Sequence, residues 1–196
     1  GAFTPTCDAR HLPGFVQQVM EQQAAASQAV EPKGPFPVEK QRELSHEVMK
    51  IFGFPFDRGR LDTAHHPFSG GADGDVRITT RYDEQDFMKS LMAVIHETGH
   101  ALYEDGRPAR WRGQPVGNSR GMTLHESQSL LLEMQASRSE EFIRFLVPLI
   151  KRVLGGSGPA WEPDNILRIY RRVEPGLVRV FADEVTYPLH VILRYK

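Results

Sequence analysis

The sequence predicts a mainly α-helical protein with one small strand element, and three observations support this class. Apolar residues recur at the spacing of a helix face over several long stretches. Residues 75–82 instead alternate apolar and polar side chains, which indicates a strand. Glycine and proline gather in short segments between these stretches, as expected of connectors.

Two helices are expected in the N-terminal part of the chain. Residues 14–30 are rich in Gln, Ala, Met and Val and contain no helix breaker after Gly14. Residues 31–37 contain three prolines and one glycine, which predicts a connector. A second amphipathic helix is expected over residues 38–52, before Gly53.

The next part of the chain is expected to bring a strand against a long helix. Residues 53–74 are rich in glycine and are expected to be irregular. The half-exposed strand over residues 75–82 is interpreted as an edge strand, of the kind that binds an extended peptide by main-chain hydrogen bonds. The following helix is expected to begin at an Asp83 cap and to end at Gly106.

The C-terminal half is expected to alternate helices with flexible breaks. The expected elements are a loop over residues 107–121, a helix over 122–146 that extends toward 153, a break over 155–159, and helices over 165–173 and 177–196. Pro148 and Pro188 should bend the two longer helices.

Length and composition fit a soluble cytoplasmic protein. The chain has 196 residues, enough for one sizeable core, and carries 24 basic against 25 acidic residues. Its apolar runs are too short to cross a bilayer, so neither a membrane nor a nucleic acid is expected as a partner. Cys7 is the single cysteine, which excludes an internal disulfide and fits a reducing compartment.

Residues 1–196 are expected to form a single domain that is a fragment of a longer chain. The sequence begins with Gly1 rather than methionine. It ends within the periodic run over residues 185–195, where no capping residue follows. Further sequence is therefore expected on each side.

One short motif carries the chemistry of the chain. It is His96-Glu97-Thr98-Gly99-His100, the H-E-x-x-H pattern of a zinc peptidase helix. Residues four apart on a helix are separated by about 6 Å along the axis and about 40° around it, so both imidazoles can reach one ion. Glu97 would lie beside that ion. The motif predicts a zincin-like helical catalytic core, with the small strand element near Asp75–Tyr82.

A catalytic zinc site needs a third protein ligand. One subclass places a histidine six residues after the second motif histidine, but that position is Gly106. The other subclass takes a glutamate from a following helix, which favours Glu126. By residue type, three alternatives remain open: Glu133, Glu104 and His125.

Five motifs that follow one another along nearly the whole chain indicate a specific protein family. They are His66-Pro67-Phe68, Asp75-x-Arg77-x-Thr79, His96-Glu97-Thr98-Gly99-His100, His125-Glu126-Ser127-Gln128 and Arg179-x-x-Ala182-Asp183. Together they resemble the carboxypeptidase Taq family of metallocarboxypeptidases. The resemblance implies that His96, His100 and Glu126 bind the metal and that Glu97 is the general base.

The resemblance also implies a fold and a setting. Members of this family are mostly helical, saddle-shaped cytosolic enzymes with a deep groove, usually homodimers, and release C-terminal residues from peptides with zinc or sometimes cobalt. The present sequence is less than half the usual family length. It also has Val178 where isoleucine is common in the fifth motif, a change of little consequence.

An exopeptidase must recognise a free carboxylate, for which an arginine is well suited. Arg179 is the first choice and Arg77 the second, although ion pairs with neighbouring aspartates would explain either arginine equally well. His66 is a further substrate contact. Expected partners for the ligand histidines are Glu133 and Asp183, and three side chains that could assist an oxyanion are Tyr103, Tyr187 and His190.

Two other functions compete with a carboxypeptidase. One is a zinc endopeptidase of the same metal class, which would cleave peptides with blocked ends. The other is a catalytically incomplete helical fragment that binds metal without hydrolysing peptides.

Overall fold

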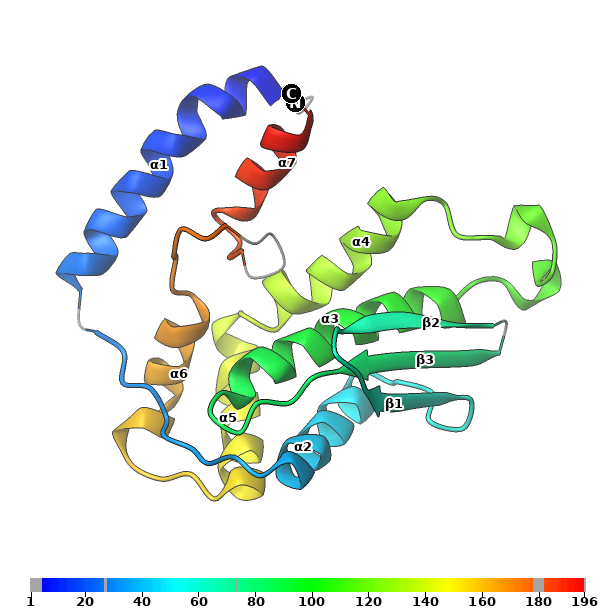
Figure 1. Ribbon diagram of the computed structural model, residues 1–196, viewed down its shortest axis with the longest axis horizontal. Helices are drawn as coiled ribbons and strands as arrows, with labels where there is room; N and C mark the ends of the chain where they lie inside the picture. Colours follow the sequence, from blue (N-terminus) through cyan, green and yellow to red (C-terminus); the bar gives the residue numbers. More distant parts are fainter. Residues whose placement is uncertain (1–4, 27, 73, 178–181, 196) are drawn as a thin grey trace.

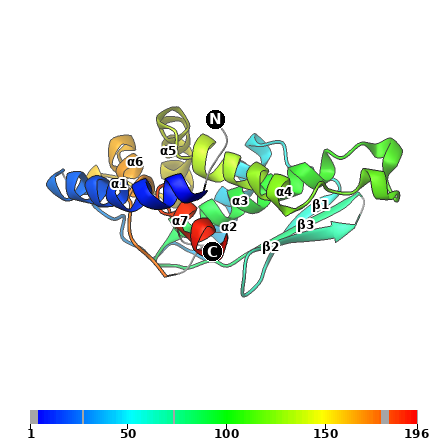
Figure 2. The same ribbon diagram turned by 90° about the horizontal axis from the view of Figure 1, so that it is seen from above.

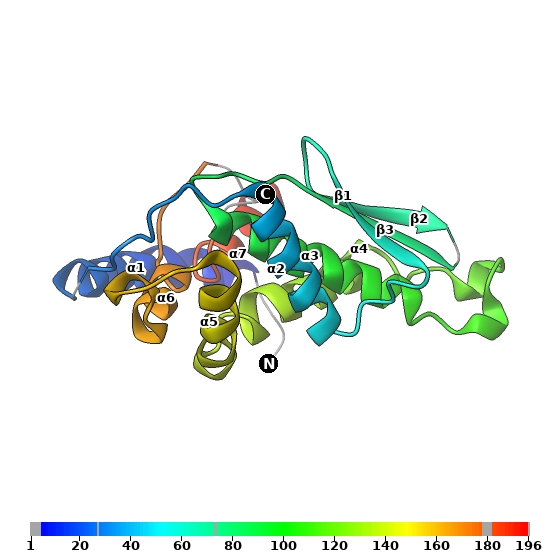
Figure 3. The same ribbon diagram turned by 90° about the horizontal axis from the view of Figure 1, so that it is seen from below.

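Helix α3 (Phe87–Asp105) is the structural centre of the molecule. The computed structural model describes residues 5–26, 28–72, 74–177 and 182–195. The small sheet lies on one side of α3 and helix α4 (Met122–Leu130) on the other, as the views from above and below show (Figures 1, 2 and 3). The mainly helical class expected from the sequence is confirmed.

The remaining elements are given in chain order. The helices are α1 (Pro5–Ala25), α2 (Val38–Ile51), α5 (Glu140–Leu154), α6 (Pro163–Tyr170) and α7 (Tyr187–Tyr195). The strands are β1 (Gly59–Thr63), β2 (Phe68–Ala72) and β3 (Asp75–Thr80). A π-helical segment spans Leu131–Ala136, and short 3-10 turns span Ala109–Trp111, Pro115–Gly117 and Pro159–Trp161.

The sheet corrects two expectations. Residues 53–74 contain β1 and β2 rather than irregular chain, and β3 is the central strand, not an edge. β1 pairs with β3 in parallel and β2 pairs with it antiparallel. Local patterning does not indicate the two outer strands, because β1 buries a single apolar side chain, Leu61, and β2 is rich in glycine, so neither shows alternation.

Asp86, rather than Asp83, caps the central helix. The Asp86 carboxylate accepts hydrogen bonds from the backbone nitrogens of Met88 (3.1 Å) and Lys89 (3.2 Å). Asp83 instead accepts one from the backbone nitrogen of Gln85 (2.8 Å) in the preceding turn. Both aspartates are cap residues by type, and the turn before the helix decides between them. The expected end at Gly106 is confirmed.

Helix α1 begins and ends earlier than expected. It starts at Pro5, a residue type that favours the first helical position, and includes Pro13. Val30 is held instead by Asn165 of α6, whose side chain accepts from the Val30 nitrogen and donates to its oxygen, each at 2.8 Å. These long-range bonds satisfy the Val30 backbone outside a helix, so the expected extension to residue 30 does not form.

Three differences concern the C-terminal half. The helix expected over residues 122–146, with an extension toward 153, is divided. The chain widens into the π-helical segment, and Ser139 then caps α5 by accepting from the Phe142 nitrogen (3.2 Å). Helix α6 covers 163–170 rather than 165–173. Helix α7 begins at Tyr187 rather than 177, and Pro188 lies in its first turn, where proline needs no backbone partner.

Two apolar clusters hold α3 in place. One joins its Phe87, Leu91 and Ile95 to α2, α5 and α6, and the other joins Val94 and Ala101 to the sheet. Burial on both sides fixes the direction in which the remaining polar face of α3 points. Among the described residues, no helix combines the length and apolar character needed to cross a membrane.

Candidate metal centre

Three side chains from two neighbouring helices converge between α3 and α4. His96 and His100 lie one turn apart on α3, and Glu126 lies on α4. The Oε2 atom of Glu126 is 3.7 Å from His96 Nε2 and 3.2 Å from His100 Nε2. One ligand atom from each side chain lies within 4.8 Å of the others. The structure thus brings together the three residues that the sequence analysis singled out.

The donor set and its dimensions fit a divalent transition metal. Two donors about 2.1 Å from one ion, at a tetrahedral angle, are about 3.4 Å apart. The two nitrogen–oxygen distances to Glu126, 3.2 and 3.7 Å, lie on either side of that value. Imidazole nitrogen and carboxylate oxygen are also the donors that catalytic zinc sites use. Small side-chain adjustments would therefore complete a three-ligand site.

The second ring nitrogen of each histidine is held by another residue. His96 Nδ1 lies 2.9 Å from Glu133 Oε2, and His100 Nδ1 lies 2.6 Å from His125 Nδ1. Both Nε2 atoms consequently face Glu126. Metal-ligating histidines characteristically use one nitrogen for the metal and the other for such a partner. Glu133 therefore occupies the position of a residue that orients a ligand histidine. The sequence analysis gave it this role and, as an alternative, that of the third metal ligand.

Glu97 is buried beside the cluster, with 7% of its surface exposed. Burial raises the pKa of its carboxyl group, an effect that the nearby His96 and His100 oppose and that the acidic residues Glu126 and Glu133 reinforce. A carboxyl group with a raised pKa is suited to accept and release a proton near neutral pH.

Glu126 is, by contrast, strongly biased toward the ionised form. Its hydrogen bond with His100 is the main cause that lowers its pKa to about 2, and burial opposes this. Burial likewise tends to lower the pKa of His96, but the hydrogen bond and charge of Glu133 raise it on balance. An anionic carboxylate facing two imidazoles is an arrangement that favours a cation.

Gly99 allows α4 to approach α3 closely. A Cβ atom at this position would lie 2.6 Å from the Cα atom of Ser129 and 2.9 Å from the backbone oxygen of Gln128. Ser129 is fully buried, and its hydroxyl donates to the backbone oxygen of Glu126 (2.7 Å). The contact between Gly99 and Ser129 therefore sets the separation of α3 and α4, and with it the distance from Glu126 to the two histidines.

Tyr187 and Asp183 have contacts other than those expected. The Tyr187 hydroxyl donates to Glu126 Oε1 (3.0 Å), while Oε2 faces the histidines. Asp183 was expected to orient a ligand histidine. Its carboxylate instead accepts hydrogen bonds from its own turn, including the backbone nitrogens of Val185 and Thr186, each at 2.9 Å. Asp183 thus shapes the turn that leads into α7 and Tyr187.

Two of the three expected substrate residues, Arg77 and His66, are not part of this cluster. Arg77 is exposed on the face of β3 that points away from α3, and its guanidinium pairs with Asp75 at 2.8 Å. His66 is exposed between β1 and β2. Arg179 lies outside the described residues. Within the described residues, no hydrogen bond or ion pair joins Arg77 or His66 to the three ligand side chains.

One side chain near the centre is indicated by no sequence motif, and two others have roles that differ from the expected ones. Arg138 donates to Glu133 Oε1 (3.2 Å), a contact that no motif predicts. His125 and Glu104 were alternative third ligands, yet His125 Nε2 lies 2.8 Å from Glu104 Oε1, behind His100. The helical spacing of four between His100 and Glu104 places them on one face, and was the available signal.

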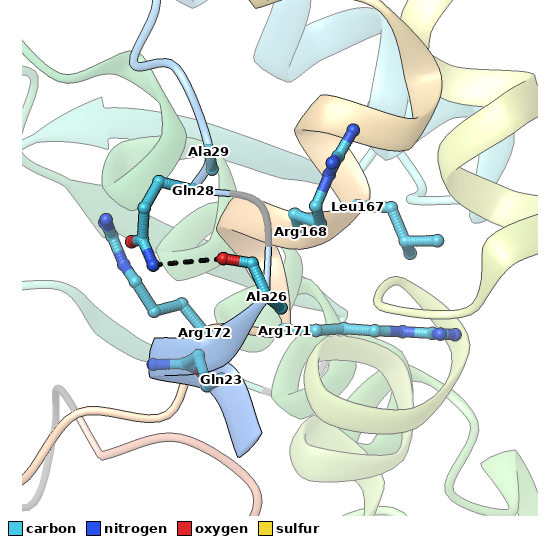
Figure 4. A pocket seen from close by; sticks show the side chains of 8 residues that line it. All are labelled: Gln23, Ala26, Gln28, Ala29, Leu167, Arg168, Arg171 and Arg172. Atoms are coloured by element: carbon cyan, nitrogen blue, oxygen red, sulfur yellow. Dashed lines mark hydrogen bonds between the residues drawn. The ribbon is translucent and has the colours of Figure 1, made fainter. Parts of the chain in front are cut away.

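A cavity of about 250 Å³ lies apart from this centre, between the end of α1 and α6. Figure 4 shows its lining, in which Gln28 donates to the backbone oxygen of Ala26. Its lining residues are Gln23, Ala26, Gln28, Ala29, Leu167, Arg168, Arg171 and Arg172. None of them belongs to the metal cluster.

Comparison with known proteins shows extensive similarity over most of the chain. The chain is 41% identical over 165 residues to "Carboxypeptidase 1" of Bacillus subtilis, covering 82% of this chain and 32% of that protein. It is 42% identical over 161 residues to "Thermostable carboxypeptidase 1" of Thermus thermophilus, covering 82% of this chain and 31% of that one. The chain therefore spans about a third of the length of these relatives.

Solved structures show the same relationship in three dimensions. The structure of "Trypanosoma Cruzi Metallocarboxypeptidase 1" superposes with a TM-score of 0.93 at 47% identity, covering 97% of this chain and 40% of that chain. The family model described as carboxypeptidase Taq (M32) metallopeptidase matches residues 9–196. The family match and the structural similarity agree, and the chain belongs to the carboxypeptidase Taq (M32) family of metallopeptidases.

Proposed function

We propose that residues 1–196 are the catalytic metal-binding domain of a zinc-dependent carboxypeptidase that releases C-terminal residues from peptides. The observation that carries the proposal is the convergence of the His96, His100 and Glu126 donor atoms between α3 and α4. Membership of the M32 family supports the same reaction class. Zinc is the proposed metal, and cobalt is an alternative that the same three donors would accept.

The chemistry divides between the ion and the chain. A divalent ion at the three donors would supply Lewis acidity, which polarises a peptide carbonyl and makes a nearby water molecule more acidic. Glu97, buried beside those donors, would take the proton from that water and deliver it to the leaving amine nitrogen. His96, His100 and Glu126 would hold their positions throughout.

Recognition of the peptide end is assigned to the residues proposed from the motifs. Arg179 would pair with the terminal carboxylate, with Arg77 as the alternative and His66 as an additional contact. Arg77 is exposed, but it lies on the face of β3 that points away from α3, and its ion pair with Asp75 would have to be exchanged for the substrate carboxylate. Arg179→Ala in the longer protein should abolish the preference for a free C-terminus over an amidated one.

A paired measurement of metal content and turnover tests the main proposal. Glu97→Gln should retain zinc affinity within a few-fold and reduce the release of C-terminal residues by at least about 100-fold, because proton transfer is lost. His96→Ala should lose both. Glu43→Gln, on the exposed face of α2, is the matched control. A Glu97→Gln variant that turns over at the parental rate would refute the assignment of the base.

Assays of the short chain can distinguish this proposal from the two competing functions, a non-catalytic metal-binding module and an endopeptidase. Assays of residues 1–196 and of a longer version would show whether the groove needs further sequence. Tight zinc binding without hydrolysis by either version would favour a non-catalytic metal-binding module. Cleavage of peptides blocked at both ends would favour an endopeptidase.

Cellular setting and partners are proposed from composition and from the family resemblance, and assembly from the resemblance alone. We propose a cytoplasmic protein that acts on peptides as a homodimer when the longer chain is present, and that does not act on nucleic acids or membranes. Sedimentation of the longer protein and fractionation of cells would test these two statements separately.

A further inference from the structure

We propose that His125 and Glu104 are positioning residues that fix the orientation and protonation pattern of His100 toward the metal. This inference rests on the proposed metal site. Glu133 orients His96, and the inference concerns the residues that would orient the other ligand histidine, His100. The relevant side chains form a chain of contacts, here called the His100 relay: His100, His125, Glu104 and Arg107.

The geometry of the His100 relay is continuous. His100 Nδ1 lies 2.6 Å from His125 Nδ1, and His125 Nε2 lies 2.8 Å from Glu104 Oε1. Glu104 Oε2 lies 2.7 Å from Arg107 Nε. Arg107 in turn donates to the backbone oxygen of Gly117 (3.0 Å), which ties the relay to the connection between α3 and α4.

Metal binding leaves one consistent arrangement of protons in this relay. The Nε2 atom of His100 faces Glu126 and needs a free electron pair to bind an ion. Its proton is then on Nδ1 and is donated to His125 Nδ1. His125 must accept with that atom, so its own proton is on Nε2, where the Glu104 carboxylate accepts it.

Packing holds His125 in the orientation that the relay requires. The ring of Tyr103 lies edge-on to it, with 4.8 Å between centroids and 66° between planes. The His125 and His100 rings are 4.7 Å apart, centroid to centroid. The side chain of His125 is half-buried, with 14% of its surface exposed. His125 therefore has neighbours on several sides that restrict rotation of its ring.

The two ligand histidines are thus supported in parallel ways. His96 is held by Glu133, which Arg138 contacts, and His100 is held by His125 and Glu104, which Arg107 contacts. A carboxylate behind a ligating imidazole orients the ring and makes it a better donor to the metal. In the His100 relay the imidazole of His125 transmits that effect from Glu104.

Graded substitutions of His125 test the proposal. His125→Phe keeps the ring but removes the acceptor, and should weaken zinc binding by about 10–100-fold, as the loss of such partners does elsewhere. His125→Asn places an oxygen near the former Nδ1 position and should restore part of that loss. His11→Phe, at an exposed position of α1, is the matched control and should bind zinc as the parent does.

The readouts are zinc affinity by chelator competition, the visible spectrum of the cobalt-loaded protein, and thermal unfolding of the metal-free protein. The expected result is the affinity order parent, His125→Asn, His125→Phe, with an altered cobalt spectrum for His125→Phe. Glu104→Gln should shift affinity in the same direction by a smaller factor, because a neutral oxygen still accepts from His125.

Two outcomes would overturn the relay. The first is an unchanged affinity and cobalt spectrum in His125→Phe. The second is an equal loss of affinity in His125→Asn and His125→Phe that matches a fall in the unfolding temperature of the metal-free protein, which would make His125 a packing residue. If the parent itself binds no zinc or cobalt, the proposed function fails together with the relay, and this result is distinct from both.

Discussion

The Ser90 hydroxyl donates to the side-chain oxygen of Gln41 (2.8 Å), which joins α2 to α3 two turns before His96. Gln41 also donates from Nε2 to the backbone oxygens of Phe36 (2.7 Å) and Asp83 (2.8 Å). One side chain, 2% exposed, therefore fastens both segments that precede α2 and α3. The frame that carries the metal helix depends on this polar junction.

Gln41→Ala should destabilise the protein by about 2–3 kcal/mol, because it leaves the buried backbone oxygen of Phe36 without its donor and also removes the part-buried bond to Asp83. Chemical denaturation of the metal-free protein would measure the loss. Gln17→Ala, on the exposed face of α1, should stay within about 0.5 kcal/mol of the parent. Equal effects of the two substitutions would show that the Gln41 junction contributes little.

Gly99→Ala should separate α3 from α4 and move Glu126 away from the two histidines. Overpacking of a tight contact typically costs about 1–3 kcal/mol, and zinc affinity should fall with it. Gly14→Ala in α1 is the control, since an added Cβ there meets no atom within 4 Å. That change should be neutral or stabilising by up to about 1 kcal/mol. Unchanged zinc affinity in Gly99→Ala would contradict the close-contact argument.

Glu133→Gln should weaken zinc binding by about 10–100-fold while leaving the fold intact, because His96 loses the charge of its partner. The substitution also removes the ionic contact with Arg138. Competition with a chelator would measure the affinity. Glu140→Gln, whose exposed carboxylate pairs with Arg144 at the start of α5, should bind zinc like the parent.

The ion pair between Arg58 and Asp105 should make stability depend on pH. Two hydrogen bonds, Nε to Oδ1 at 2.8 Å and Nη2 to Oδ2 at 2.9 Å, tie the segment before β1 to the last residue of α3. The hydrogen bond with Arg58 is the main cause that lowers the pKa of Asp105 in the folded protein. Its stabilising effect is therefore complete above the unfolded pKa of about 3.9 and is lost as the pH falls through the folded value.

Thermal unfolding of the parent and Asp105→Asn should accordingly differ at neutral pH and converge in acid. The difference should be modest, since Arg58 is 42% exposed. Asp57→Asn tests the other, more exposed carboxylate on the same arginine and should have a smaller effect. A gap between parent and Asp105→Asn that persists once the carboxyl is protonated would point to packing rather than charge.

Much of the frame was predictable because its signals are local. Helix α2 and the strand at β3 lie close to their expected bounds, and the H-E-x-x-H spacing alone placed two imidazoles on one face of α3. The missed elements depend on distant partners. Strand β1 pairs with β3, and the backbone of Val30, beyond the end of α1, is hydrogen-bonded to Asn165. No local sequence pattern indicates either pairing.

The residue types of the metal centre were predictable from the sequence, but the orientations of their side chains were not. Helical spacing could place His125, Glu104 and Glu133 near the ligands, yet which nitrogen of which ring faces which oxygen depends on how α4 lies on α3. The π-helical segment adds a local change of pitch between Glu126 and Arg138. Pattern analysis assumes a constant helical period and therefore could not follow it.

The ligands of the proposed site lie on either side of the exposed connection over residues 106–121, which carries Arg110 and Arg112. Trypsin acting after either arginine would sever the backbone between His100 and Glu126. An ion bound by His100 and Glu126 would then link the two resulting peptides. The apolar cluster that joins α3 to α5 and α6 also spans the cut, so removal of the ion by a chelator should lower the unfolding temperature of the nicked protein rather than separate the two peptides.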